Sequence, residues 1–212
     1  MRGYEEREKK MRAEFNFKRA FWNASKLYRA LEDYAQENNL VTVDVGCGRK
    51  KFRGSTGLDE RSNSMADMHH DLNTFPYPLK DNIYDIVICR HVLEHMDNVP
   101  ATLEEFYRAA KPGGIVIVEV PHFTHPEAFR HWQHKHFFTM GSLDYFAPGN
   151  PYYKTALEMV NKHVYIHDLF RAIGLEWLMN RFDHFYERHL AFILQASSIV
   201  YIMRAVKDKG GA

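Results

Sequence analysis

The sequence predicts an α/β fold around a parallel sheet, and three observations support this class. Short runs rich in β-branched residues recur along the chain, separated by turns and by a well-patterned helix. The first run ends in a Gly-Cys-Gly turn, where the backbone can bend sharply and approach a ligand. The chain has 212 residues, 45% of them hydrophobic, which is enough for one domain with a substantial core.

The chain begins with a predicted helical cap over residues 1–39. Apolar side chains recur at spacings of three and four from Phe17 to Tyr34, and Asn38 followed by Asn39 ends the pattern. We expect this helix to cap the site or to mediate contact with a second copy of the chain.

Strands are expected wherever a short β-rich run is closed by turn residues. In the first part of the chain these runs are residues 40–45, 56–59, 66–70, 83–89 and 115–120. A helix is expected between the last two, because Asn98 can cap it and Pro100 suits its first turn. Lys111-Pro112-Gly113-Gly114 would end that helix.

The second part of the chain has a less regular pattern. Residues 121–162 are rich in histidine, aromatic residues and proline, so we expect an insertion over the site. A sixth strand is expected over 175–179 and the last over 198–203. Helices are expected over 167–173 and 185–194, the second of which should pack on the sheet rather than on a membrane.

Composition excludes several classes of protein. The 28 basic and 27 acidic residues give a net charge of +1, so nucleic acid is not favoured as a partner. No apolar stretch approaches 18 residues, and Cys47 and Cys89 form no CxxC pair. We therefore expect a cytoplasmic protein without stable membrane insertion.

The turn after the first strand carries the features of a ligand site. Asp44 can accept hydrogen bonds from an amine, while Gly46 and Gly48 let the backbone approach a ligand closely. Asp59 lies 15 residues after Asp44, at the end of the next expected strand. A carboxylate there suits the two hydroxyls of a ribose.

As an ordered set, these and later motifs resemble class I S-adenosylmethionine-dependent methyltransferases. The matching stretches are Val43–Gly48, Gly57–Asp59, His70–Asn73, Tyr84–Cys89 with His91–His95, and Leu103–Gly114. The resemblance implies a Rossmann-like sheet of seven mostly parallel strands, with an antiparallel last strand placed between the fifth and sixth. It also implies S-adenosyl-L-methionine as the cofactor.

A single methyltransferase domain over residues 1–212 is expected. Its parts would be the N-terminal helical cap (1–39), the cofactor-binding core (40–120), the lid or substrate insertion (121–162) and the C-terminal part of the sheet (163–212).

The resemblance also implies which positions contact the cofactor. Besides Asp44, these are Gly46, Cys47 and Gly48 at the methionine part, Asp59 at the ribose, Asp71 and Leu72 at the adenine, and Arg90 and His91 at the sulfonium and substrate.

The loop after Gly48 departs from the family pattern. Only seven residues, 49–55, separate Gly48 from Thr56, whereas a parallel crossover usually needs a dozen or more. We therefore expect the first crossover helix to be shortened or lost. Without its N-terminus, the cofactor's carboxylate would need another partner, and Arg49, Lys50, Lys51 or Arg53 could supply the positive charge.

Methyl transfer to a hydroxyl would be aided by a general base, and histidine is suited to that role near neutral pH. His91, His95 and His122 are the candidate catalytic residues, since each follows a strand end. Each of the three could instead line the substrate pocket or form a structural hydrogen bond.

A cluster of histidines lies in the insertion, at positions 122, 125, 131, 134 and 136. These spacings match no standard metal site and no cysteine pair is near, so we expect no metal. Neighbouring aromatic residues favour a polar, aromatic acceptor pocket instead. The runs His134–Thr139 and Ser142–Phe146 resemble a subgroup of methyltransferases associated with surface-glycan assembly.

The sequence thus predicts a methyltransferase that transfers the methyl group directly to oxygen or nitrogen of a small-molecule or glycan acceptor. A cofactor-binding regulatory protein without catalysis is one alternative. A nucleic-acid methyltransferase is another, although Arg90-His91-Val92 stands where an Asn-Pro-Pro-Tyr-like motif would be expected. A nicotinamide dehydrogenase is disfavoured, since Lys51 replaces its third glycine.

Overall fold

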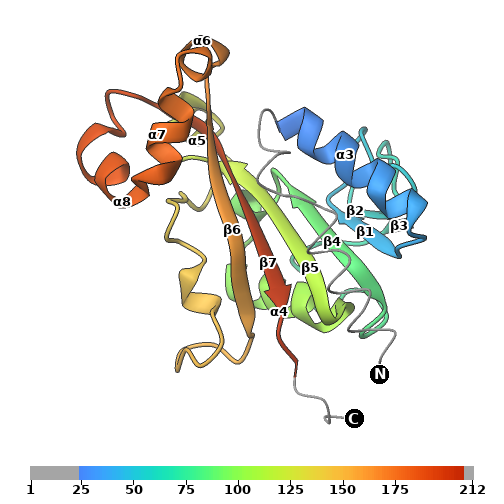
Figure 1. Ribbon diagram of the computed structural model, residues 1–212. Coiled ribbons are helices and arrows are strands. Elements are labelled where there is room, and N and C mark those ends of the chain that lie inside the picture. Colours follow the sequence, from blue (N-terminus) through green and yellow to red (C-terminus); the bar gives the residue numbers. More distant parts are fainter. Residues whose placement is uncertain (1–23, 208–212) are drawn as a thin grey trace.

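The computed structural model describes residues 24–207, which contain a seven-stranded sheet (Figure 1). The strands are β1 (Thr42–Val45), β2 (Thr56–Asp59), β3 (Met68–His69), β4 (Tyr84–Arg90), β5 (Ala110–Pro121), β6 (Leu157–Ile166) and β7 (Ala196–Ala205). Their order is β3-β2-β1-β4-β5-β7-β6. β7 runs antiparallel to both of its neighbours, and the remaining pairs are parallel. The Rossmann-like sheet expected from the sequence, with its antiparallel last strand between the fifth and sixth, is confirmed.

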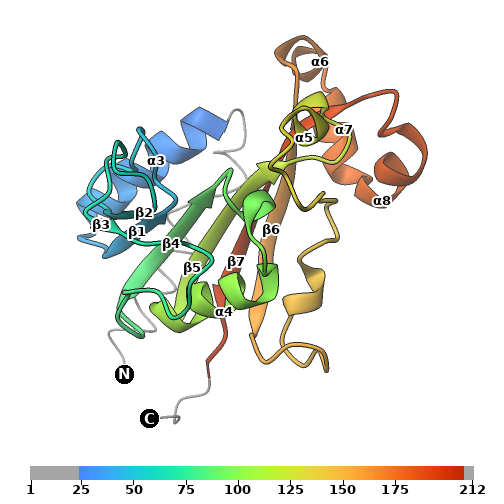
Figure 2. The same ribbon diagram turned by 180° about the vertical axis from the view of Figure 1, so that it is seen from behind.

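Helices cover both faces of this sheet (Figures 1 and 2). They are α3 (Ala24–Glu37), α4 (Val99–Ala109), α5 (Pro126–Arg130), α6 (Asp168–Ala172), α7 (Leu175–Arg181) and α8 (Asp183–Phe185), with two 3₁₀ turns, η1 (Leu93–His95) and η2 (Asp144–Phe146), and a π-helical segment, η3 (Tyr186–Leu190). The α4 helix begins as predicted, because the Asn98 side chain accepts a hydrogen bond of 3.0 Å from the Ala101 backbone.

The strand expected over 175–179 is wrong, because this segment forms α7. Glu176 and Met179 are buried on one side of it, at helical spacing. The Glu176 carboxylate accepts a hydrogen bond of 3.1 Å from the Ile166 backbone at the end of β6. The sixth strand is β6 itself, which lies partly within the segment expected to be an irregular insertion.

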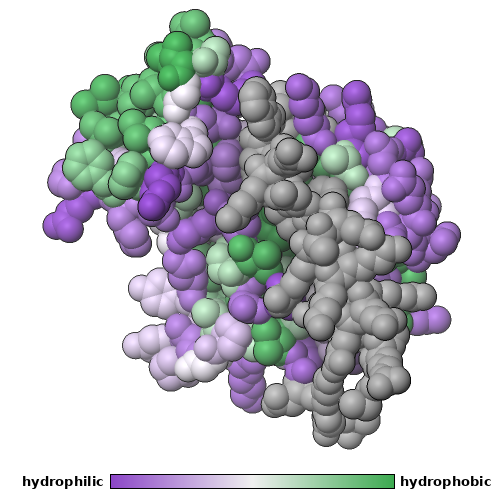
Figure 3. All heavy atoms as spheres, in the orientation of Figure 1, coloured by the Kyte–Doolittle hydropathy of each residue, from purple (hydrophilic) through white to green (hydrophobic). Residues whose placement is uncertain are grey.

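The segment 185–194 is helical only as far as Leu190, and the packing on the sheet expected for it is found only in part: Tyr186 is fully buried in the core, but other large side chains face solvent. Phe192 and Ile193 are each 78% exposed. They belong to a wider apolar surface that also includes Leu169, Phe170, Ile173, Trp177, Leu178, Phe182 and Phe185. Figure 3 shows apolar side chains gathered over α6 to α8. Within residues 24–207, no helix is both long and apolar enough to cross a membrane.

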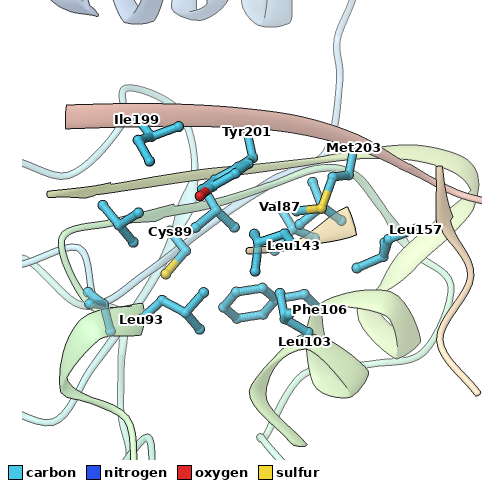
Figure 4. Close-up of a cluster of buried hydrophobic side chains, with 14 of the residues drawn as sticks. Val87, Cys89, Leu93, Leu103, Phe106, Leu143, Leu157, Ile199, Tyr201 and Met203 are labelled. Carbon is cyan, nitrogen blue, oxygen red and sulfur yellow. The ribbon is translucent and has the colours of Figure 1, made fainter. Parts of the chain in front are cut away.

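Alternate residues of the central strands serve two separate apolar clusters, as the period-2 geometry of a strand requires. Val87 and Cys89 of β4 face α4, where they meet Leu103 and Phe106 (Figure 4). The intervening Ile86 and Ile88 face the other side of the sheet, in the cluster that contains the buried side chains of α3.

The crossover from β1 to β2 has no helix, so the shortened connection predicted from the sequence is confirmed. A parallel sheet needs cover on both faces, and α3 supplies it on this side. Leu27 and Leu31 of α3 pack in one cluster with Phe52 from the crossover and with Ile86 of β4. The earlier apolar positions of the predicted helical cap, including Phe17, lie outside the described residues.

Phe52 anchors the helix-free crossover, and its replacement should show this. Phe52 is fully buried, so Phe52→Ala leaves a cavity and should lower the free energy of unfolding by about 3–5 kcal/mol. Urea unfolding followed by circular dichroism measures the change. The matched control is Phe192→Ala, which removes an exposed ring and should change stability by no more than about 0.5 kcal/mol. Equal effects of the two substitutions would contradict the anchoring role.

Candidate functional site

Charged side chains gather at the carboxyl ends of the parallel strands, where ligands of open α/β sheets bind. Asp44 lies near the end of β1, Asp59 ends β2 and Arg90 ends β4. In the sheet register, Arg90 lies beside Glu119 of β5. The two acidic residues predicted from the sequence therefore share one edge with Arg90 and with a glutamate that the prediction did not include.

Asp44 is fully buried and holds the crossover loop against the sheet. Its Oδ2 atom accepts hydrogen bonds of 2.7 Å from the Phe52 backbone and 2.7 Å from Arg90. Burial raises the pKa of Asp44, although the Arg90 guanidinium and the Phe52 N–H oppose that rise. Oδ1 has no hydrogen-bond partner among residues 24–207. A buried carboxylate oxygen without a partner is costly, so Oδ1 is suited to a cationic group such as the amine of a ligand.

Arg90 serves the loop rather than an open pocket. Besides its bond to Asp44, its guanidinium donates to the Lys50 carbonyl at 2.8 Å. It also lies over the Tyr28 ring of α3, 5.1 Å from the ring centre. The sequence placed Arg90 beside the sulfonium and substrate; the structure shows it tying β4, the crossover and α3 together.

The two glycines of the turn have different surroundings, so the absence of a side chain has a different consequence at each position. Gly46 has φ of +71°, and a Cβ atom there would lie 2.1 Å from Val92 Cγ2. Gly48 has φ of +55°, but nothing lies within 4 Å of the corresponding Cβ position. Gly46 therefore permits close packing, whereas Gly48 borders open space that a ligand can enter. Between them, burial raises the pKa of the Cys47 thiol to about 11, with Asp44 and Asp59 adding to the effect, so this side chain stays neutral.

Asp59 closes the same turn from β2. Its Oδ2 accepts a hydrogen bond of 2.8 Å from the Gly48 backbone, and its Oδ1 accepts one of 2.8 Å from the Arg61 backbone. Each carboxylate oxygen can accept two hydrogen bonds, so one lone pair on each remains for a ligand hydroxyl. Asp59 thus fits the ribose role expected from the sequence while also shaping the glycine turn.

Asp71 and Leu72 follow β3 at the same edge and differ in exposure. Leu72 is buried, and its carbonyl accepts a hydrogen bond of 2.8 Å from the Tyr77 hydroxyl. Asp71 is exposed, and it accepts hydrogen bonds from the Asn73 backbone at 2.9 Å and the Thr74 hydroxyl at 3.0 Å. These bonds lower the pKa of Asp71. A carboxylate held in place beside a buried apolar side chain is compatible with the expected adenine contact.

The four basic residues of the crossover fall into two groups. Lys51 forms an ion pair of 2.7 Å with Asp67, and Arg53 pairs with acidic side chains of α3. Arg49 and Lys50 are exposed, and neither has an ion-pair partner within the described part of the chain. Of the cations proposed to replace a helix N-terminus, these two remain available to a ligand carboxylate.

His91 lies between two carboxylates just beyond β4. Its Nδ1 is 3.6 Å from Glu94 Oε1, and its Nε2 is 3.6 Å from Glu119 Oε1. Burial works against the charged ring, but the two carboxylates prevail and raise the pKa of His91 to about 10. At neutral pH the ring is therefore cationic, so it can donate hydrogen bonds but cannot accept a proton.

Glu94 and Glu119 are the functional candidates that sequence reasoning missed. Burial alone would raise the pKa of Glu119, yet His91, Tyr28 and Ser198 together hold that pKa below its ordinary value. Glu94 is 1% exposed, and its Oε2 has no hydrogen-bond partner among the described residues. For Glu119 the available signal was a single charged residue in the otherwise apolar run 115–120.

The other two candidate histidines have different surroundings. His122 is fully buried; the Thr124 side chain contacts its Nδ1 at 2.7 Å, and its Nε2 is 3.3 Å from Glu187. Both ring nitrogens are thus engaged inside the protein. His95 is half-buried, its Nδ1 donates to the Gln133 carbonyl at 3.3 Å, and burial lowers its pKa.

Comparison with known proteins identifies the family. A family model described as a methyltransferase domain matches residues 14–205. The chain belongs to this family. The expected assignment to class I S-adenosylmethionine-dependent methyltransferases is thereby confirmed, as is S-adenosylmethionine as the cofactor. The unpartnered Asp44 oxygen and the open space at Gly48 fit this group.

Solved structures of similar fold include methyltransferases of bacteria and archaea. An S-adenosylmethionine-dependent methyltransferase of Archaeoglobus fulgidus has a TM-score of 0.52 and 15% identity, covering 84% of this chain and 94% of that one. An S-adenosylmethionine-dependent methyltransferase of Mesorhizobium loti has a TM-score of 0.53 and 15% identity. This match covers 78% of the present chain and 90% of the other one. A chain from the complex between the Haloferax volcanii Trm112 methyltransferase activator and a putative methyltransferase has a TM-score of 0.53 and 17% identity. This match covers 95% of the present chain and 94% of the other one. These likenesses show the shared fold.

Two curated relatives match shorter segments. An uncharacterised protein of Methanocaldococcus jannaschii is 31% identical over 101 residues, which cover 42% of this chain and 44% of the relative. The malonyl-[acyl-carrier protein] O-methyltransferase of Pectobacterium atrosepticum is 28% identical over 95 residues, which cover 37% of this chain and 38% of the relative. The chain thus spans less than half the length of either relative.

The two unpaired cations of the crossover should contribute to cofactor binding. The double substitution Arg49→Ala/Lys50→Ala should weaken S-adenosylmethionine binding about 10- to 100-fold, which corresponds to about 1.5–3 kcal/mol for a charged hydrogen bond. Isothermal titration calorimetry measures the affinity. Arg53→Ala is the control, because Arg53 is already paired with α3 and its loss should weaken binding less. Unchanged affinity in the double variant would show that the cofactor's carboxylate binds elsewhere.

The pairing of His91 should make stability depend on pH. Because its pKa rises from 6.5 to about 10 on folding, protonated His91 stabilises the fold fully below pH 6.5, and the contribution is lost as the pH rises through about 10. The difference in unfolding free energy between wild type and His91→Gln should therefore shrink over this interval. Urea unfolding at several pH values measures it, with the exposed His184→Gln as control. A pH-independent difference would mean that His91 is not held as a cation.

Proposed function

We propose that this protein transfers the methyl group of S-adenosylmethionine directly to an oxygen or nitrogen of a small-molecule or glycan acceptor. The observation that carries the proposal is the buried Asp44 Oδ1, which has no partner among the described residues and lies at the glycine turn. The family assignment and the second carboxylate, Asp59, at the same edge of the sheet also support the proposal.

The bound cofactor supplies a methyl group already activated by its sulfonium, so the protein's task is to bind and align. Asp44 would accept a hydrogen bond from the amino group, and Arg49 with Lys50 would neutralise the carboxylate. Asp59 would hold the ribose hydroxyls. Asp71 and Leu72 stay proposed as the adenine contacts.

The acceptor would meet His91 and Glu94 beyond the end of β4. Both ring nitrogens of cationic His91 face carboxylates, so His91 would hold Glu94 in place, and the unpartnered Glu94 Oε2 can accept a hydrogen bond from a hydroxyl or amine. These two groups would orient the acceptor atom toward the methyl group. Among the three proposed catalytic histidines, His91 lies 3.6 Å from Glu94 at the end of β4, whereas His122 is fully buried.

The chemical class of the acceptor is suggested by exposed aromatic side chains after β5. Phe129 and Trp132 are 62% and 92% exposed, and Phe129 stacks on Phe137 with ring centres 4.6 Å apart. Aromatic faces beside hydrogen-bonding groups are suited to sugars and other ring-bearing molecules. These residues support a glycan or other ring-bearing acceptor, as do the two sequence runs that resemble glycan-associated methyltransferases.

Two further proposals concern the whole protein. The exposed apolar side chains of α6 to α8 support a homodimer, since apolar patches of this kind often mark contacts between chains. Light scattering of the purified protein would reveal a dimer. A cytoplasmic location is supported by two cysteines, Cys47 and Cys89, which are buried as free thiols.

The ribose carboxylate gives the sharpest test of the proposed function. Asp59→Asn keeps the shape of the side chain but removes its charge, and it should weaken S-adenosylmethionine binding about 10- to 100-fold in calorimetry. The control is Asp85→Asn, because Asp85 forms its ion pair with Lys111 near the start of β4. Circular dichroism checks that both variants fold.

Turnover then separates the remaining alternatives. Wild type that binds S-adenosylmethionine should convert it to S-adenosylhomocysteine only in the presence of an acceptor, in a panel of sugars, nucleotide sugars, small phenols and RNA. Turnover with RNA would support the nucleic-acid alternative. Failure of the wild type to bind the cofactor would overturn the proposal.

A further inference from the structure

Three histidines from two separate segments meet at the carboxyl edge of the sheet. His95 ends η1, which follows β4, whereas His131 and His134 follow α5 after β5 (Figure 2). One ring nitrogen of each lies within 4.8 Å of one nitrogen of each of the others. The ring centres are 5.3 Å apart for His95 and His131, 4.6 Å for His95 and His134, and 5.0 Å for His131 and His134.

Backbone contacts bring these rings together without the help of a ligand. The His134 N–H donates to the His131 carbonyl at 2.9 Å, which closes a turn between the two residues. The Lys135 N–H donates to the Glu94 carbonyl at 2.8 Å, which places that turn against η1. The cluster is therefore fixed by the fold of both segments.

The hydrogen bonds of the rings define which nitrogen is free. His95 Nδ1 lies 3.3 Å from the Gln133 carbonyl, and His134 Nδ1 lies 3.1 Å from the Ala128 carbonyl. A carbonyl can only accept, so in both rings Nδ1 carries the hydrogen. In the neutral ring this leaves Nε2 with a lone pair. Metal-binding histidines are commonly oriented by the same kind of bond from the second nitrogen to a carbonyl.

We propose that His95, His131 and His134 bind one zinc-type divalent cation. Imidazole nitrogens suit this class of metal, and three histidines leave the fourth position of a tetrahedral site to water. Zinc–nitrogen bonds of about 2.0–2.1 Å require the nitrogens to lie about 3.4 Å apart, so the cluster would contract slightly on binding. His131 is exposed at the end of α5 and can make this movement.

The bound cation would join the segment after β4 to the segment after β5, and so would fix the part of the chain that carries Phe129 and Trp132. The sequence led us to expect no metal, because the spacings of the insertion's histidines match no standard site and no cysteine pair is near. That group of histidines did not include His95, which is distant in the sequence. In the structure the others have separate tasks: His122 contacts Glu187, His125 caps α5, and His136 donates to the Met96 carbonyl at 2.9 Å.

The test uses the full chain without a histidine tag, stripped with a chelator and titrated with ZnCl₂ in a calorimeter. Wild type should bind one equivalent, and binding should raise its melting temperature. His131→Ala and His134→Ala should lose that equivalent, whereas His184→Ala, which removes an exposed histidine elsewhere, should keep it. Loading with Co²⁺ should give visible absorption bands typical of tetrahedral coordination, and these bands should be absent from His131→Ala.

Two results would overturn the proposal: no stoichiometric binding by wild type, or a full equivalent retained by both His131→Ala and His134→Ala. Circular dichroism of each variant before titration shows that a lost equivalent does not reflect unfolding. The test does not involve S-adenosylmethionine or an acceptor, so its outcome is independent of the proposed methyl transfer.

Discussion

The buried carboxylate of Asp44 fixes three parts of the chain at the edge of the sheet where we propose that the cofactor binds. One of its oxygens accepts hydrogen bonds from the Phe52 backbone and from Arg90. A buried charge is tolerated only when it is paired and hydrogen-bonded, so the guanidinium is as necessary as the carboxylate. Through its contact with Tyr28, Arg90 extends the same interaction to α3. The crossover loop, the sheet and α3 therefore depend on one charged contact.

The lost crossover helix explains why two carboxylates are needed at this turn. In a helix, backbone N–H groups are satisfied by carbonyls of the preceding turn, but the loop over 46–55 has no such ladder. Asp44 and Asp59 provide acceptors for the Phe52 and Gly48 N–H groups instead. The same two carboxylates are the proposed partners of the cofactor. Under this proposal, the fold and ligand recognition at this edge would share their residues.

Local pattern was sufficient for the first five strands, of which the first, fourth and fifth are clear β-rich runs. It failed where the structure depends on distant partners. The α7 segment is a short apolar run, for which helical and strand periods are hard to distinguish, and its buried Glu176 is acceptable only because His163 and the end of β6 meet it. β6 was missed because it is an edge strand with a register irregularity after Met159 and many half-exposed residues.

The candidate site, like the fold, was predicted where it depends on neighbouring residues and missed where it depends on residues distant in the sequence. Asp44 and the glycines are neighbours in the sequence and were predicted, whereas the pairing of His91 with Glu119 arises from the register of β4 and β5. His91 has φ of +54°, a conformation that costs a residue with a side chain about 1–3 kcal/mol. Its N–H donates to the Glu119 carbonyl at 2.8 Å, and its ring lies between the Glu94 and Glu119 carboxylates. A strained backbone held by three such interactions keeps the imidazolium at the strand end, where an acceptor would meet the methyl group.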